Sequence, residues 1–176
     1  LWIMMIIETS RFAFAQSPHF SSKRSKSNLD GAQEPERASS LKILDKEECI
    51  HIRNLLEKTK IALLRKDSTA LRELSDQTVH SACNYQDSAS ITISVLVYTL
   101  SKLVERNDFN KIKNWDYFIK KFNSILDLAI KAIISENQEK YEKYIKMSRA
   151  LLESQISLKK YIQDVFLKAS INKASK

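Results

Sequence analysis

The chain has 176 residues, 43% of them hydrophobic, and a formal net charge of +8, which suits one folded domain with a core. Its single Gly and both Pro precede residue 41. This composition excludes β-sandwiches, barrels and Gly-rich phosphate-binding folds and leaves an all-α fold. Most of the net charge lies in residues 111–176, which hold 14 Lys and Arg against seven Asp and Glu.

Residues 1–40 are expected to form a disordered or non-native N-terminal tail. The apolar run at residues 1–7 is too short to span a bilayer, and Glu8 and Arg11 interrupt the segment that a signal peptide would need. Residues 16–40 are too polar to offset the entropy lost on ordering. Because the first residue is Leu1, a fragment or a mis-started reading frame is an alternative origin of the tail. We therefore place a helical bundle domain in residues 41–176 and expect a cytoplasmic protein.

Two helices are predicted at the start of this domain. Asp45 with Glu48 three residues later indicates a capping box, and apolar residues then recur at helical spacing to about Lys66. Asp67 or Ser68 is expected to cap a second, shorter helix. The two helices should form an antiparallel hairpin.

Residues 90–105 are apolar on nearly every side. Their β-branched side chains would also suit a buried strand, but the length of the segment and the absence of a second strand candidate favour a helix. A helix without a polar face must be covered by neighbours. We therefore expect this segment to be central and the most buried.

The remaining pattern predicts a fourth helix at residues 115–133 and a long final helix at residues 138–174. Apolar residues recur in the final segment at seven-residue intervals, which is typical of a helix packed along its neighbours. A break near Ser154 or Ser157 is an open alternative. The predicted fold is all-α, an antiparallel bundle of about five helices with a long C-terminal helix.

Arg72, Asp76 and His80 recur at four-residue spacing, on one stripe of the second helix. In a ribonuclease, a His held by an Asp can act as general base while an Arg binds phosphate. We favour the simpler alternative, an ion pair of Arg72 with Asp76 and a half-buried His80. The helical HEPN ribonucleases also carry Arg and His on one helix, but closer together than here, so the similarity reaches only the level of the bundle.

The most basic stretch is residues 155–176, where five Lys are opposed only by Asp164. Clustered lysines attract a phosphate backbone, but many helix surfaces are rich in lysine for solubility alone, which is the alternative that we favour. Any contact with nucleic acid is expected to be weak and independent of its sequence. The residues assigned to this contact are Lys159, Lys160, Lys168 and Lys173.

Three tyrosines, Tyr141, Tyr144 and Tyr161, alternate with lysines near the C-terminus. Aromatic and basic residues together can bind single-stranded nucleic acid by stacking. At helical spacing we instead expect the tyrosines to face the bundle and the lysines to face solvent.

No motif predicts a metal site, a cofactor or a small-molecule ligand. Cys49 and Cys83 lack the companion ligands of a zinc site and are expected to be free thiols in a reducing compartment. Paired carboxylates, a nucleophile with its base and a phosphate loop were not found in the sequence of the helical domain, so we do not expect an enzyme.

Two stretches of the helical domain form recognisable motifs. The first is ELSDQTVHSA at residues 73–82, with YQDS at residues 85–88 and the apolar run that follows. The second is YIQDVF at residues 161–166 with INKAS at residues 171–175. Together they resemble a family of small, uncharacterised archaeal all-helical proteins. The resemblance implies a helical core followed by a segment like a helix-turn-helix, which would be absent from the present chain, and it supplies no catalytic residues.

Two functions remain as hypotheses. The first is a non-enzymatic helical interaction module that binds a protein partner or a second copy of itself, such as the core of a DNA-associated regulatory protein, with no membrane contact. The alternative is a HEPN-like helical ribonuclease using Arg72 and His80. An exposed His80 in a cleft beside basic side chains would favour the ribonuclease, and a His80 packed against apolar neighbours would favour the module.

Overall fold

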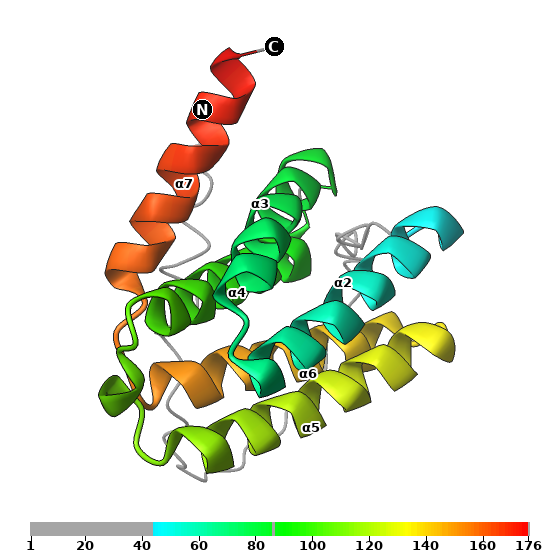
Figure 1. Cartoon of the computed structure of the whole chain (residues 1–176). Coiled ribbons are helices and arrows are strands. Elements are labelled where there is room, and N and C mark those ends of the chain that lie inside the picture. Colours follow the sequence, from blue (N-terminus) through cyan, green and yellow to red (C-terminus); the bar gives the residue numbers. More distant parts are fainter. Residues whose placement is uncertain (1–43, 86, 176) are drawn as a thin grey trace, which may run out of the picture. The chain divides into compact units, whose positions relative to one another are not determined.

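The structure, a computed structural model, describes residues 44–85 and 87–175. Its elements in chain order are α2 (Lys46–Arg65), α3 (Ser68–Tyr85), α4 (Ser88–Glu105), the 3₁₀ turn η1 (Phe109–Lys111), α5 (Trp115–Ile134), α6 (Gln138–Glu153) and α7 (Lys159–Ala174). The all-α prediction is confirmed, and these two ranges contain six α-helices and no strand (Figure 1). The predicted tail at residues 1–40 lies outside the described residues.

Local capping signals set the starts of the first helices. At α2, Asp45 Oδ1 accepts the Glu48 N–H at 2.9 Å and Glu48 Oε2 accepts the Asp45 N–H at 3.0 Å, which confirms the predicted capping box. Lys66 ends α2 in the left-handed conformation. Asp67 Oδ1 then accepts the Ala70 N–H at 3.0 Å and caps α3.

The α4 helix is the most buried element of the described chain, as predicted. Thirteen of its 18 residues are buried, and Leu96 is 2% exposed. Its buried Thr99 donates its hydroxyl proton to the Val95 carbonyl at 2.7 Å, so this polar group is satisfied within the helix. Helices α3, α6 and α7 contact α4 and cover it (Figure 1).

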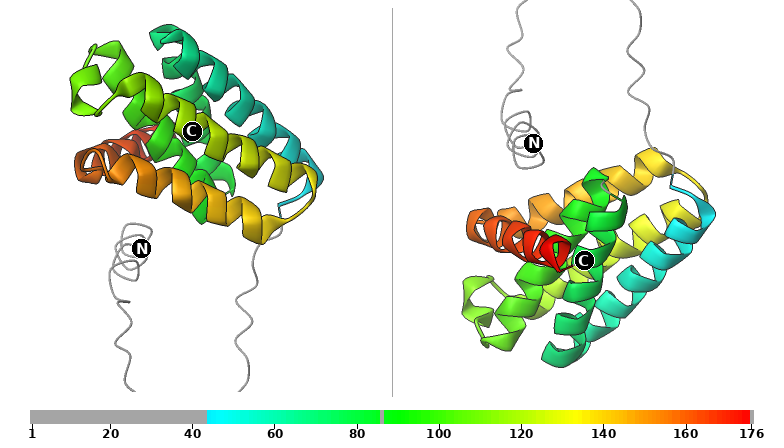
Figure 2. Two further views of the ribbon diagram at one scale, coloured as in Figure 1. Left: turned by 90° about the horizontal axis from the view of Figure 1, so that it is seen from below. Right: turned by 90° about the horizontal axis from the view of Figure 1, so that it is seen from above.

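The long final helix predicted for residues 138–174 is divided into α6 and α7. The Ser154 hydroxyl donates to a carbonyl of the last α6 turn at 2.7 Å. Gln155 Oε1 accepts the Lys113 N–H at 3.1 Å, which ties the linker to the connection before α5. Helix α6 contacts α5 and α4, whereas α7 contacts α4 and α3 (Figure 2). The break thus redirects the chain onto a different pair of helices.

Within the two described ranges, none of the helices combines the length and the apolar character needed to cross a membrane.

Candidate functional site

Arg72, Asp76 and His80 lie on the exposed side of α3. Asp76 Oδ1 accepts a hydrogen bond from Lys168 Nζ of α7 at 2.8 Å. Among the residues that the structure describes, no hydrogen bond or ion pair joins Asp76 to Arg72 or to His80. The expectation of an Arg72–Asp76 ion pair and a half-buried His80 is therefore wrong. The Asp76 carboxylate pairs with Lys168, and His80 is exposed.

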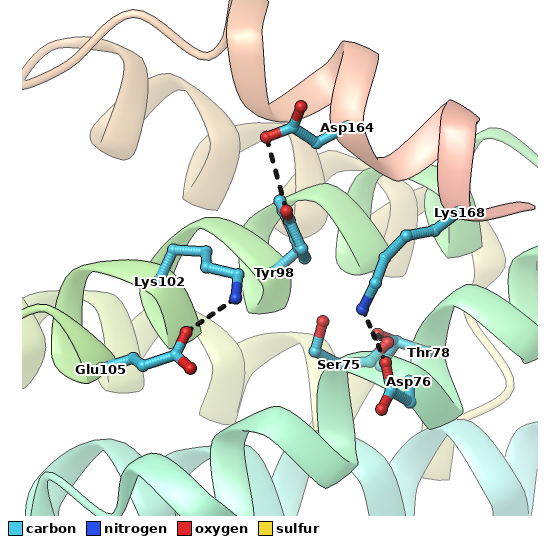
Figure 3. Close-up of polar contacts among 8 residues, drawn as sticks. All are labelled: Ser75, Asp76, Thr78, Tyr98, Lys102, Glu105, Asp164 and Lys168. Carbon is cyan, nitrogen blue, oxygen red and sulfur yellow. Dashed lines mark hydrogen bonds and ion pairs between the residues drawn. The ribbon is translucent and has the colours of Figure 1, made fainter.

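Tyr98 of α4 lies between two lysines that belong to different helices (Figure 3). Its ring centroid is 5.7 Å from Lys102 Nζ and 5.3 Å from Lys168 Nζ, within the range of cation–π contacts. Each ammonium group also has a carboxylate partner, Glu105 for Lys102 at 2.7 Å and Asp76 for Lys168. Charged groups of α3, α4 and α7 thus meet around one aromatic ring.

Tyr98 also attaches α7 to α4 directly. Its hydroxyl donates to Asp164 Oδ2 at 3.4 Å, and its ring meets the Tyr161 ring edge-on with centroids 6.4 Å apart. Burial, followed by the negative charge of Asp164, raises the pKa of Tyr98. The phenol therefore stays protonated at neutral pH and remains a hydrogen-bond donor.

The Ser75 hydroxyl is buried beneath this cluster and has no hydrogen-bond partner in the described part of the chain. In Figure 3 it points toward the space between the ends of Lys102 and Lys168. Two ammonium groups and a hydroxyl are donors that an oxyanion could accept from. Asp76 and Glu105 already neutralise both lysines, however, so we assign no anion site here.

The four lysines predicted to contact nucleic acid do not share one face of α7. Lys168 is half-buried and faces α3 through Asp76, whereas Lys159, Lys160 and Lys173 are exposed. At 3.6 residues per turn, Lys159 and Lys168 are about 180° apart around the helix axis. The structure therefore assigns Lys168 to the attachment of α7 and leaves the other three side chains on the surface.

Two large apolar side chains of α7 are also on the surface. Leu167 is 63% exposed and Ile171 is 57% exposed, whereas the buried positions of α7 are Val165 and Ala169. Because Leu167 and Ile171 are four residues apart, they lie on one stripe of α7, and Lys160 lies on the same stripe. The seven-residue apolar repeat in the sequence indicates only the buried side of α7, so it does not reveal this exposed pair.

The three tyrosines of α6 and α7 are buried or half-buried, in agreement with the prediction that they face the bundle. Tyr141 is 1% exposed, and Tyr144 and Tyr161 are half-buried. The exposed lysines beside them on α6 are Lys140, Lys143 and Lys146. Tyr141 therefore has no ring face open to a nucleic-acid base, and Tyr161 packs edge-on against Tyr98.

Within the described residues, no group of three or more His, Cys, Asp or Glu could hold a metal ion, and neither Cys49 nor Cys83 forms a disulfide bond. A comparison with known protein families, with curated proteins and with solved structures found no match. The resemblance to the archaeal family and the similarity to HEPN ribonucleases stay predictions.

Proposed function

We propose that this chain is a non-enzymatic helical interaction module, an antiparallel bundle that binds an acidic protein partner through the outward face of α7. We define the outward face by Lys159, Lys160, Leu167 and Ile171. The exposure of Leu167 and Ile171 beside these lysines carries the proposal. An amphipathic helix face of this kind fits a partner groove that is apolar at its centre and acidic at its edge.

Other partners fit the outward face less well. A second copy of α7 would bring lysines against lysines, and like charges facing each other oppose association. A phosphate backbone would attract Lys159 and Lys160 but would leave Leu167 and Ile171 in water. We therefore expect nucleic-acid contact to be weak, independent of sequence and lost at higher salt.

His80 is exposed, as the ribonuclease alternative requires, but the contacts around it give that alternative less support. A general base is oriented by a hydrogen-bonded neighbour, and the carboxylate four residues before His80 is paired with Lys168. In the described ranges Asp76 does not orient the His80 ring, because its hydrogen bond goes to Lys168. If the purified protein cleaved RNA without metal and His80→Ala abolished the cleavage, the ribonuclease hypothesis would be favoured over the interaction module.

The proposal can be tested with two probes, an acidic amphipathic helical peptide of Glu, Leu and Ala, and a short random-sequence DNA duplex. The pair Leu167→Ser and Ile171→Ser should weaken binding of the peptide by about tenfold or more, because two apolar side chains lose their burial. The same pair should leave duplex binding unchanged. Fluorescence anisotropy of labelled probes at two salt concentrations measures both affinities.

A charge-reversal control distinguishes the effect of the outward face on binding from the effect of the net charge of the protein. The double change Lys159→Glu and Lys160→Glu should weaken the binding of both probes. The double change Lys143→Glu and Lys146→Glu alters the net charge by the same amount on the exposed side of α6 and should weaken binding less. Equal effects of the two pairs would show that only net charge matters. The proposed partner class would be refuted if the Leu167→Ser and Ile171→Ser pair left the affinity for the peptide unchanged. It would also be refuted if the peptide did not bind at low salt.

A further inference from the structure

A surface cavity of about 580 Å³ lies where the start of α2 meets the end of α5 and the start of α6 (Figure 2). Small-molecule sites typically measure about 300–1,000 Å³, so a compact organic ligand fits this volume. The apolar residues that line the cavity are Leu44, Ile50, Ala132, Ile133 and Ile134. An apolar chain that enters the cavity would therefore exchange water for hydrocarbon contacts.

Two positively charged side chains of α2, Lys46 and Arg53, line the same cavity. They are seven residues apart, so they lie on one side of the helix, about two turns from each other. Within the described ranges, neither side chain takes part in an ion pair or a hydrogen bond. Lys46 is exposed, whereas Arg53 is half-buried. A guanidinium group that is partly withdrawn from water without a counter-charge is unfavourable, and an anion in the cavity would compensate it.

The negative charges near the cavity do not cancel this excess. Among the described residues, Glu136 is the one acidic residue that lines the cavity, and its exposed carboxylate pairs with neither Lys46 nor Arg53. Two other carboxylates at the start of α2, Asp45 and Glu48, do not line the cavity and accept backbone N–H groups in the capping box. The lining therefore carries two positive charges against one negative charge, and this balance favours an anionic ligand.

We propose that this cavity binds a small amphipathic carboxylate, a molecule with an apolar chain and one negatively charged end. The carboxylate pairs with Arg53, whose planar guanidinium matches carboxylate geometry, and the more exposed Lys46 adds attraction. The apolar chain lies against Ile50 and Ile133. This site is separate from the outward face of α7 and does not depend on the proposed module function. It also departs from our sequence-based expectation that the chain has no small-molecule ligand.

The test of charge uses the full chain and three probes with the same chain length, octanoate, 1-octanol and octylamine, titrated by calorimetry. Octanoate should bind most tightly. Arg53→Gln should weaken octanoate binding by about tenfold or more, the usual effect of a charge-assisted hydrogen bond, and should leave octanol binding unchanged. Arg65→Gln is the matched control, because it makes the same change on α2 at an exposed residue that does not line the cavity. Glu136→Gln should tighten octanoate binding, because it removes a like charge from the lining.

The test of the apolar wall uses Ile50→Ser, with Ile61→Ser as its control. Both residues belong to α2 and are similarly exposed, 46% and 49%, but Ile61 does not line the cavity. Ile50→Ser should weaken octanoate and octanol alike, because both probes place their chain against this residue, whereas Ile61→Ser should change neither affinity. Since both side chains are partly in water, thermal unfolding without ligand should give similar melting temperatures for the two variants and the parent.

The proposal would be overturned if octanol or octylamine bound as tightly as octanoate, or if either variant of the lining and its matched control had equal effects. A weaker affinity of Glu136→Gln for octanoate would also overturn it. The same holds if octanoate did not bind at any concentration below that at which it forms micelles.

Discussion

Replacing Leu96 with Ala should test the central position of α4 most directly. Leu96 is 2% exposed on a helix covered by α3, α6 and α7. The change removes three buried carbons, and at about 0.8 kcal/mol for each the transfer term alone is roughly 2.4 kcal/mol. Neighbouring helices cannot close the hole completely, so the total loss should be about 3–5 kcal/mol.

Urea unfolding followed by circular dichroism measures this loss, and Leu167→Ala is the matched control. Leu167 has the same side chain but is 63% exposed, so its replacement should change the free energy of unfolding by less than about 0.5 kcal/mol. The slope of the unfolding free energy against urea should stay the same in both variants. A loss below about 1 kcal/mol at Leu96, or equal losses at the two leucines, would refute the central placement of α4.

Three further changes test other parts of the fold. Asp45→Ala should lower the free energy of unfolding by about 1 kcal/mol because it removes the α2 cap; an unchanged value in urea would contradict the role of the capping box. A double-mutant cycle of Asp76→Asn and Lys168→Met should give a coupling of about 0.2–1 kcal/mol, since water still reaches both side chains, and a larger coupling would mean that the pair is desolvated. The raised pKa of Tyr141 means that the unfolded chain releases this proton first, so stability should fall as pH rises above the usual value of 10. Tyr141→Phe should lessen that fall in a pH series of melting temperatures, and equal falls in the two proteins would contradict the burial of the phenol.

The helix starts could be predicted because capping is local. Asp45 and Asp87 each accept a backbone N–H three residues later, and this signal is visible in the sequence without any knowledge of the tertiary structure. The burial of α4 followed from its lack of a polar face. These features depend on residues within a few positions of one another.

The contacts of α7 could not be predicted because they depend on distant residues. The apolar repeat continues through the break, and Leu158 and Val165 are buried on either side of the α7 start, so periodicity alone does not show that the chain turns. The local prediction paired Asp76 with Arg72, but its partner is Lys168, 92 residues away. The inward direction of Tyr141 was predicted, whereas its unpaired hydroxyl depends on how α2, α5 and α6 pack around it.

The position of α7 at the end of the described fold has a consequence for synthesis on the ribosome. Its attachment points on α3 and α4, Asp76 and Tyr98, precede their partners Lys168 and Asp164 by 92 and 66 residues. At about 5–20 residues per second, Asp76 is made roughly 5–18 s before Lys168 exists. Tyr98 is made roughly 3–13 s before Asp164 exists, and in that interval the nascent chain presents Tyr98 and its apolar surroundings uncovered. We expect a chaperone that recognises exposed aromatic side chains to bind this surface first and to leave it when α7 emerges.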